Sequence, residues 1–223
     1  MPNNVLELPL LQTFILPEQI RDGTILREPI CNQLLSRCRY LRVLDLHGLG
    51  ITSLPSSIGK LIHSRYLNSS QTPIIGLPNS ITRLQNLQSL ELYDGKPKSL
   101  PAGTFKRLTN LRSLDGRETY FPLPSGIGQL ASLHKLTHFL VCMHKRGRIQ
   151  LRDLKSLDNL RGFLMVVFRS ALEVPIHEAK EANLGSKHGL EELEMDFDER
   201  VDGEALLEGV KPHPNLKMLT IRS

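Results

Sequence analysis

The chain has 223 residues, of which 40% are hydrophobic and 23% are charged, a composition typical of a soluble folded protein. Its formal net charge of +5 is too small to indicate nucleic-acid binding by itself. Three cysteines, no signal peptide at the N-terminus and no run of about 18 apolar residues argue against secretion and against a membrane span, so we expect a cytoplasmic protein.

Residues 1–37 are the least regular part of the chain. An apolar series predicts one strand near residues 13–16, followed by a loop over residues 21–24. Apolar residues at helical spacing then predict a helix that covers Ile30, Leu34 and Leu35.

Four short blocks recur at a fixed interval through residues 38–137. Each begins with Leu-Pro, and the prolines lie 23 residues apart at Pro55, Pro78, Pro101 and Pro124. Leucines follow each block in the pattern L-x-x-L-x-L. A period of this length with this pattern is the signature of a leucine-rich repeat. One repeat cannot bury its own apolar face, so consecutive repeats must stack into a solenoid.

The first regular repeat shows how each coil is built. Strand alternation directs Leu44 and Leu46 inward and Asp45 outward. Leu54-Pro55 then turns the chain, and the residues that follow cover the core from the other side. We therefore predict an α/β solenoid, a horseshoe with parallel strands on the concave face and short helices, 3-10 turns or loops on the convex face.

The second repeat departs from the pattern. Ser64 and Ser69 stand where the first repeat has Leu41 and Leu46. Two apolar anchors are lost, and each contributes roughly 1.5–3 kcal/mol when fully buried. The asparagine that such repeats often carry after the strand is also missing from these turns. We expect local looseness over residues 64–75.

Beyond residue 137 the period lengthens. We expect strands near residues 139–142, 164–167, 193–197 and 219–221, and helices over residues 176–184 and 203–210. The whole chain, residues 1–223, is expected to form a single repeat domain with an irregular first part, a regular middle and longer repeats over 138–223. It stops inside a strand without a polar cap, which indicates truncation at the C-terminus.

Several segments resemble the repeat region of plant coiled-coil, nucleotide-binding, leucine-rich-repeat immune receptors. They are residues 40–46, 54–61, 127–130, 160–162, 178–184 and 212–217. The resemblance covers essentially the whole chain. It implies a non-enzymatic recognition and autoregulatory module whose partners are proteins: a pathogen effector or a guarded host protein, and the nucleotide-binding domain of the same receptor. ADP or ATP would then bind only to that domain, which this chain lacks.

The residues themselves predict no cofactor, metal or catalytic centre. Gly59-Lys60 is followed by Leu61, so it cannot be a phosphate-binding loop, which needs Ser or Thr there and an earlier glycine. His138, Cys142 and His144 lie close in sequence but lack a fourth zinc ligand. We interpret them as a strand residue flanked by solvated histidines.

Charge is distributed unevenly along the second half. Residues 135–169 contain eight Lys or Arg against two acids, whereas residues 173–208 contain twelve acids against three bases. Adjacent blocks of opposite sign can attract each other or dock partners. The basic residues are not interleaved with stacking aromatic residues, so nucleic acid is not an expected partner.

The outward side chains of the strands form the predicted contact surface, with Tyr66 and Tyr93 as aromatic anchors. Alternation also directs His138 and Leu140 outward. The predicted partner-binding residues are Asp45, His47, Tyr66, Asn68, Glu91, Tyr93, Asp115, Arg117, Glu192, Glu194 and Asp196.

Two other classes of function remain open. Leu-Pro repeats of this length also resemble intracellular signalling scaffolds that bind small GTPases, and a nucleotide-binding domain directly upstream would decide against these. A ubiquitin ligase of the bacterial effector kind would need a catalytic cysteine domain. Cys31, Cys38 and Cys142 all fall within the repeats, which argues against it.

Overall fold

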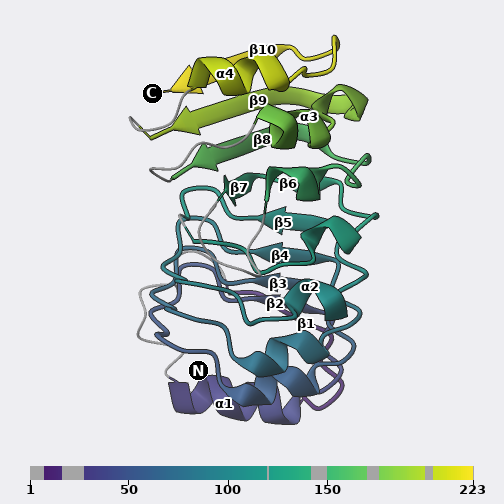
Figure 1. The fold of residues 1–223 in the computed structure, drawn as a ribbon. Helices are drawn as coiled ribbons and strands as arrows, with labels where there is room; N and C mark the ends of the chain where they lie inside the picture. The colour runs from purple at the N-terminus through teal and green to yellow at the C-terminus, as the bar shows by residue number, and fades with distance from the viewer. Residues whose placement is uncertain are drawn as a thin grey trace.

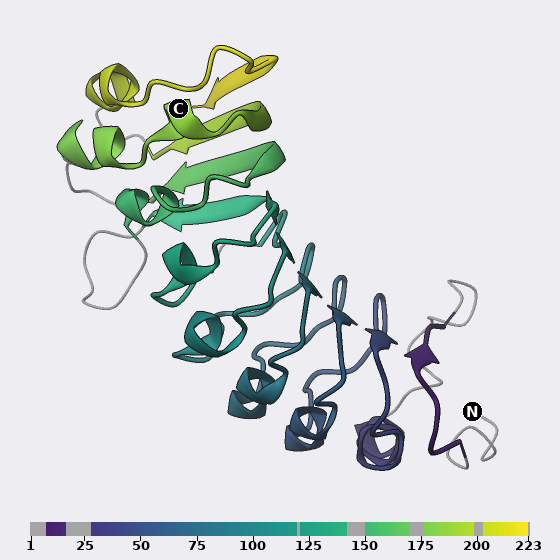
Figure 2. The ribbon, with the colours of Figure 1, turned by 90° about the vertical axis from the view of Figure 1, so that its right-hand side faces the viewer.

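The chain winds into a curved solenoid. The computed structural model describes residues 8–16, 28–119, 121–141, 150–169, 176–198 and 203–222. Successive coils stack along one axis, and each adds a strand beside the previous one (Figure 1). The strands line the inner, concave side of the arc and the helices lie on the outer, convex side (Figure 2). The predicted α/β solenoid is therefore confirmed.

All strand pairs are parallel, in two sheets. The first sheet has the order β1 (Thr13–Phe14), β2 (Val43–Asp45), β3 (Tyr66–Asn68), β4 (Ser89–Glu91), β5 (Ser113–Asp115) and β6 (Lys135–Leu136). The second has the order β10 (Met218–Arg222), β9 (Gly189–Phe197), β8 (Arg161–Phe168) and β7 (His138–Val141). Within each sheet, sequential strands are neighbours, as expected when each coil is one repeat.

In the described residues, the convex side carries short helical segments. The α-helices are α1 (Glu28–Arg37), α2 (Thr104–Arg107), α3 (Ile176–Glu181) and α4 (Gly203–Gly209). The 3-10 helices are η3 (Ser56–Lys60), η4 (Asn79–Arg83), η5 (Ile127–Gln129), η6 (Leu151–Leu154) and η7 (Leu184–Ser186). Pro55 and Pro78 precede η3 and η4 with φ of −69° and −70°, the value to which the proline ring restricts the backbone.

The core is a ladder of aliphatic side chains. Leu44, Leu67, Leu90 and Leu114 pair in register across β2 to β5, and none is more than 2% exposed. Phe105 fills the convex side of the third repeat and is fully buried. The periodic leucines therefore have the common role that their spacing predicts.

Two glycines allow neighbouring 3-10 helices to approach closely. A Cβ on Gly59 would lie 2.7 Å from the Cβ of Ser80 and 2.9 Å from its carbonyl oxygen. A Cβ on Gly128 would lie 2.9 Å from the carbonyl oxygen of Asp153. The recurring Ile-Gly pair thus sets the spacing between repeats on the convex side.

The second repeat keeps its strand despite its two serines. Ser64 and Ser69 are buried, and the Ser64 Oγ donates a hydrogen bond to the Tyr66 carbonyl at 3.4 Å. The Ser69 carbonyl accepts one from the Thr72 Oγ1 at 2.7 Å. The Ser64 hydroxyl thus makes a polar contact at a position where the first repeat has a buried leucine, and the Thr72 hydroxyl holds the backbone after the strand.

We predict that backbone amides in residues 64–75 exchange hydrogen faster than those in β4, because fewer apolar contacts oppose local opening. Native-state hydrogen exchange measures this directly. Replacing Ser64 by leucine should slow exchange in the segment. Equal protection in residues 64–75 and in β4 would contradict the prediction.

The expected elements beyond residue 137 are present, with different lengths. Strands β8 and β9 extend over eight and nine residues because their apolar alternation continues past the short repeat strands. The helix expected over residues 176–184 ends earlier, since Asn183 adopts a left-handed φ of 52° before η7 begins. The loop expected over residues 21–24 lies outside the described residues.

His138 and Leu140 are buried, so their predicted exposure was wrong. They are 4% and 5% exposed, and Leu140 lies in register with the buried Val167 of β8. Apolar side chains on neighbouring long strands cover one another here, which alternation within one strand does not reveal. Burial, reinforced by the nearby Arg169, lowers the pKa of His138 to about 4, which keeps the imidazole neutral. Cys142 and His144 lie outside the described residues.

Candidate functional site

Four of the predicted site residues occupy the last position of the strand in four consecutive repeats. Asp45, Asn68, Glu91 and Asp115 lie in register across β2 to β5. Three of these side chains accept a hydrogen bond from the backbone N–H two residues on, at 2.9 Å for Asp45, 2.9 Å for Asn68 and 3.2 Å for Asp115. Such Asx turns stop the strand. These turn-stabilising side chains lie within the strands, not after them where such repeats often carry asparagine, so the repeat pattern did not predict them.

These four residues are less accessible than alternation suggests. Asn68 is 6% exposed and Asp115 only 1%, whereas Asp45 and Glu91 are half-buried. Two of these four predicted contact residues therefore present little surface to a partner. Their main contribution is to hold the turns that follow them.

Asp115 is the centre of an ion-pair cluster. Its carboxylate accepts hydrogen bonds from Lys135 Nζ at 2.8 Å, Thr137 Oγ1 at 2.8 Å and Arg117 Nη2 at 3.1 Å. Burial raises the pKa of the Asp115 carboxyl, but the bonds from Lys135, Arg117 and Thr137 outweigh it, and the net pKa lies below its usual value. Asp115 is therefore ionised and holds two half-exposed cations in place.

Tyr93 connects the first repeat to the fourth. Its hydroxyl lies 3.3 Å from His47 Nδ1, and the two ring centroids are 5.5 Å apart. The guanidinium carbon of Arg117 lies 5.6 Å from the centre of the Tyr93 ring, within the range of a cation–π contact. Ser70, on the intervening repeat, is small and fully buried, which leaves room for the contact above it.

Tyr66 and Glu91 form a second contact between repeats. The Tyr66 hydroxyl donates a hydrogen bond to Glu91 Oε2 at 3.1 Å. Burial and then the Glu91 charge raise the pKa of Tyr66, so its proton stays in that bond at physiological pH. We call the five residues that the structure links in this region the central patch: His47, Tyr66, Glu91, Tyr93 and Arg117.

A pocket of about 570 Å³ lies on the concave face where the two sheets meet. Its lining is mainly basic, with one aromatic and one acidic side chain. The lining residues are Arg117, His134, Lys135, Thr137, Arg161, Gly162, Phe163 and Glu192. A β-bulge between Gly162 and Phe163 interrupts the register of β8 beside it. This pocket was not predicted from the sequence, although two of its basic residues, Lys135 and Arg161, belong to the basic block over residues 135–169.

The predicted acidic residues of β9 fall into two groups. Glu192 faces the pocket just described, alongside Arg117. Glu194 instead pairs with Arg222 at 2.9 Å, and Asp196 pairs with Arg169 at 2.7 Å. The structure thus brings Glu192 to the pocket that Arg117 also lines but leaves the other two in separate ion pairs.

Within the described part of the chain, no three His, Cys, Asp or Glu side chains are grouped so that they could hold a metal ion. In the same residues, no helix has the length and apolar character needed to cross a membrane.

Comparison with known proteins gives a consistent result. A family model for the leucine-rich repeat region matches residues 19–223. The chain is 41% identical over 194 residues to the putative disease resistance protein RGA1 of Solanum bulbocastanum, with 84% of the chain and 19% of that protein covered. It is 39% identical over 148 residues to the putative disease resistance RPP13-like protein 2 of Arabidopsis thaliana, with 63% and 16% covered. The chain thus spans a fifth or less of the length of these relatives.

Solved structures share the architecture. A leucine-rich-repeat protein of Leptospira interrogans, LIC12759, superposes with a TM-score of 0.61 at 21% identity, over 99% of this chain and 57% of that one. The Arabidopsis receptor kinase HAESA, solved with the peptide hormone IDA and the co-receptor SERK1, gives 0.58 at 19% identity, over 74% and 28%. At these identities the likeness shows the fold alone.

Stacked parallel strands, the buried leucine ladder and the family match together define the class: the chain belongs to the leucine-rich-repeat family. Within it, the sequence is the repeat region of a plant disease resistance protein of the nucleotide-binding, leucine-rich-repeat type.

Proposed function

We propose that this chain is the non-enzymatic recognition and autoregulatory module of a plant intracellular immune receptor, acting in the cytoplasm. Its concave face binds a protein, either a pathogen effector or a guarded host protein. The module also contacts the nucleotide-binding domain of the same receptor, which would hold ADP or ATP, since we assign no cofactor to this chain. The disease resistance relatives support this proposal over the GTPase-binding scaffold.

The observation that carries the proposal is the ordered central patch. Tyr66 and Tyr93 are each held by a polar contact to another repeat, with Glu91 and His47 respectively. Aromatic and arginine side chains commonly dominate the energy of protein interfaces. Side chains already held in one conformation lose less entropy when a partner binds.

We predict that Tyr93→Ala and Glu91→Lys, each introduced into the full-length receptor, weaken partner binding by about tenfold or more, the loss of one interface anchor. Alanine removes the ring beneath Arg117, and lysine reverses the charge that holds Tyr66. Binding is measured by titration of the purified receptor, and signalling by the defence response in leaves.

The matched control is Ile75→Ala, which removes an exposed apolar side chain between β3 and η4, away from the central patch. It should leave binding and signalling unchanged. If both patch variants behave like this control, the assignment of the concave site is wrong.

A further inference from the structure

A second charged surface lies along the edge where the strands begin. The residues just before the strands, together with the first residue of β8, form a column. Each residue's backbone N–H donates a hydrogen bond of 2.7–2.8 Å to the carbonyl of the previous member. Its members from the first regular repeat onward are Arg42, Arg65, Gln88, Arg112, His134 and Arg161. Five of the six are basic, so the stacking of repeats turns scattered residues into one continuous row.

A parallel row lies on the adjoining convex elements. The last residues of α1, η3, η4 and α2 are Arg37, Lys60, Arg83 and Arg107. Cations near helix ends are favoured by the local carbonyl groups. That effect explains this row alone and gives no reason for the row before the strands.

The exposed Lys and Arg side chains of these rows in the first four regular repeats, with the neighbouring Arg39 and Lys106, form what we call the basic edge. They are Arg37, Arg39, Arg42, Lys60, Arg65, Arg83, Lys106, Arg107 and Arg112. The segments that supply them, residues 37–42, 60–65, 83–88 and 106–112, contain no Asp or Glu. Within the described residues, none of these cations forms an ion pair, in contrast to Lys135 and Arg117 on the concave face.

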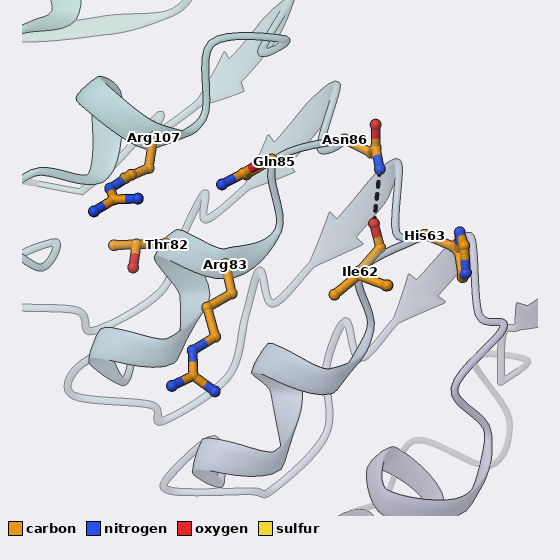
Figure 3. A pocket seen from close by; sticks show the side chains of 7 residues that line it. All are labelled: Ile62, His63, Thr82, Arg83, Gln85, Asn86 and Arg107. Atoms are coloured by element: carbon orange, nitrogen blue, oxygen red, sulfur yellow. Dashed lines mark hydrogen bonds between the residues drawn. The ribbon is translucent and has the colours of Figure 1, made fainter.

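The basic edge is hollowed between repeats. A pocket of about 510 Å³ is lined by Ile62, His63, Thr82, Arg83, Gln85, Asn86 and Arg107. Figure 3 shows the guanidinium groups of Arg83 and Arg107 projecting from neighbouring repeats with Thr82 between them. A second hollow of about 400 Å³ adjoins it and shares Ile62 and His63.

The edge is rigidly built. Asn86 Nδ2 donates to the Ile62 carbonyl at 2.8 Å, and Asn110 Nδ2 donates to the Gln85 carbonyl at 2.8 Å, each bond joining one repeat to the previous one. The backbone beneath the pocket is therefore fixed before any ligand arrives, which favours binding.

We propose that the basic edge docks an acidic protein surface, whose carboxylates lie against Arg83 and Arg107 and whose aliphatic side chain covers Ile62. This surface is separate from the central patch, and the proposal does not depend on the proposed function. Guanidinium groups bind carboxylates with two parallel hydrogen bonds.

The composition of the edge favours a protein over the other polyanions. Ile62 is 52% exposed amid the cations, and such a mixture of apolar and charged side chains is common at protein interfaces. A single-strand nucleic acid would need free aromatic faces for its bases. Tyr40 is the exposed aromatic residue here, and its ring stacks on His63 at 5.8 Å. A membrane surface would need a row of apolar side chains to insert, and Ile62 and Tyr40 do not form one.

The test uses the full chain and a fluorescent peptide of Glu, Asp and Leu, titrated at about 0.15 M salt, where charges are screened beyond ~8 Å. Arg83→Glu with Arg107→Glu should weaken binding by at least about tenfold. The matched control, Lys96→Glu with Lys98→Glu, makes the same change in net charge beyond the opposite end of β4 and should change binding by less than about twofold.

Two further experiments distinguish between the possible partners of the basic edge. Ile62→Ala should weaken binding of the Leu-containing peptide and leave a peptide of Glu, Asp and Gly unaffected. Single-stranded RNA, duplex DNA and vesicles of anionic phospholipid are titrated in parallel.

Equal weakening by both charge-reversed pairs would overturn the proposal, as would tighter binding of RNA, DNA or vesicles than of the peptide. Circular dichroism checks that each variant is folded. If a charge reversal unfolds the chain, Arg83→Gln and Arg107→Gln replace it, and each should weaken peptide binding by about threefold. No change with these variants would also overturn the proposal.

Discussion

Replacing Phe105 by alanine is expected to lower the free energy of unfolding by about 3–5 kcal/mol. Phe105 is among the largest fully buried side chains, and it occupies the convex position that Ile58, Ile81 and Ile127 fill in the neighbouring repeats. Its removal leaves a cavity between repeats whose backbones are held by hydrogen bonds on both sides, so the site cannot collapse freely. Urea denaturation followed by circular dichroism measures the loss.

The control is Phe105→Leu, which retains an apolar side chain of nearly the same volume and should cost about 1.5 kcal/mol or less. Each repeat contacts only its neighbours, so hydrogen exchange in the alanine variant should rise most in β4 and β5 and least in β10. A loss below about 1 kcal/mol for the alanine variant would mean that the repeats close around the gap, against this prediction.

The regular repeats were predictable because one physical constraint dominates them. Leu44, Leu67 and Leu90 recur at the repeat period and must share one dry interior, since no single coil can bury them. The sequence therefore determined which side of each strand faces the core, and the structure agrees in β2 to β5.

Accessibility on the concave side was much less predictable. Alternation assigns Asp115 and His138 to the outward side, yet both are buried, because neighbouring strands supply the side chains that cover them. The pocket that contains Arg117 and Phe163 forms between residues far apart in sequence. The burial of these side chains depends on how whole strands pair, and a local sequence pattern does not predict that pairing.

On the convex side, the burial of Lys187 was also not predictable from the sequence. In the sequence it is one basic residue in an acidic block, whereas the structure places it at a core position with no exposed surface. Its ammonium group donates to Asp158 Oδ1 at 2.8 Å and to the Lys155 carbonyl at 3.0 Å. These bonds compensate the buried charge of Lys187 at a position where the regular repeats have leucine. The core position of Lys187 could not be predicted, because the period of the longer repeats is not constant.

Replacing Asp115 by alanine is expected to lower the free energy of unfolding by about 3 kcal/mol near neutral pH. Hydrogen bonds to charged groups contribute about 1.5–3 kcal/mol each, and those to Asp115 share one carboxylate and are not additive. The loss is limited because Lys135 and Arg117 are half-exposed and become hydrated when the carboxylate is removed. The buried Thr137 hydroxyl also loses its acceptor.

The part of this stabilisation that depends on the charge of Asp115 should be lost in acid. Its pKa in the folded chain lies below the ordinary value of 3.8, so the unfolded chain takes up this proton first as pH falls. The difference in unfolding free energy between wild type and Asp115→Ala should therefore be constant at neutral pH, begin to shrink near the ordinary pKa and level off at a smaller value below the folded one. Urea denaturation across this pH range measures the difference.

Asp115→Asn separates charge from geometry. Its amide oxygen can still accept the Arg117 N–H and keep the Asx turn, but it carries no charge for Lys135. This variant should lose less stability than the alanine variant and show no titration of its own. If wild type and Asp115→Ala instead differ by the same amount at every pH, the ion pairs contribute nothing and Asp115 acts only through its turn. Because Asp115 also positions two cations at the rim of the concave pocket, losing it should weaken partner binding as well.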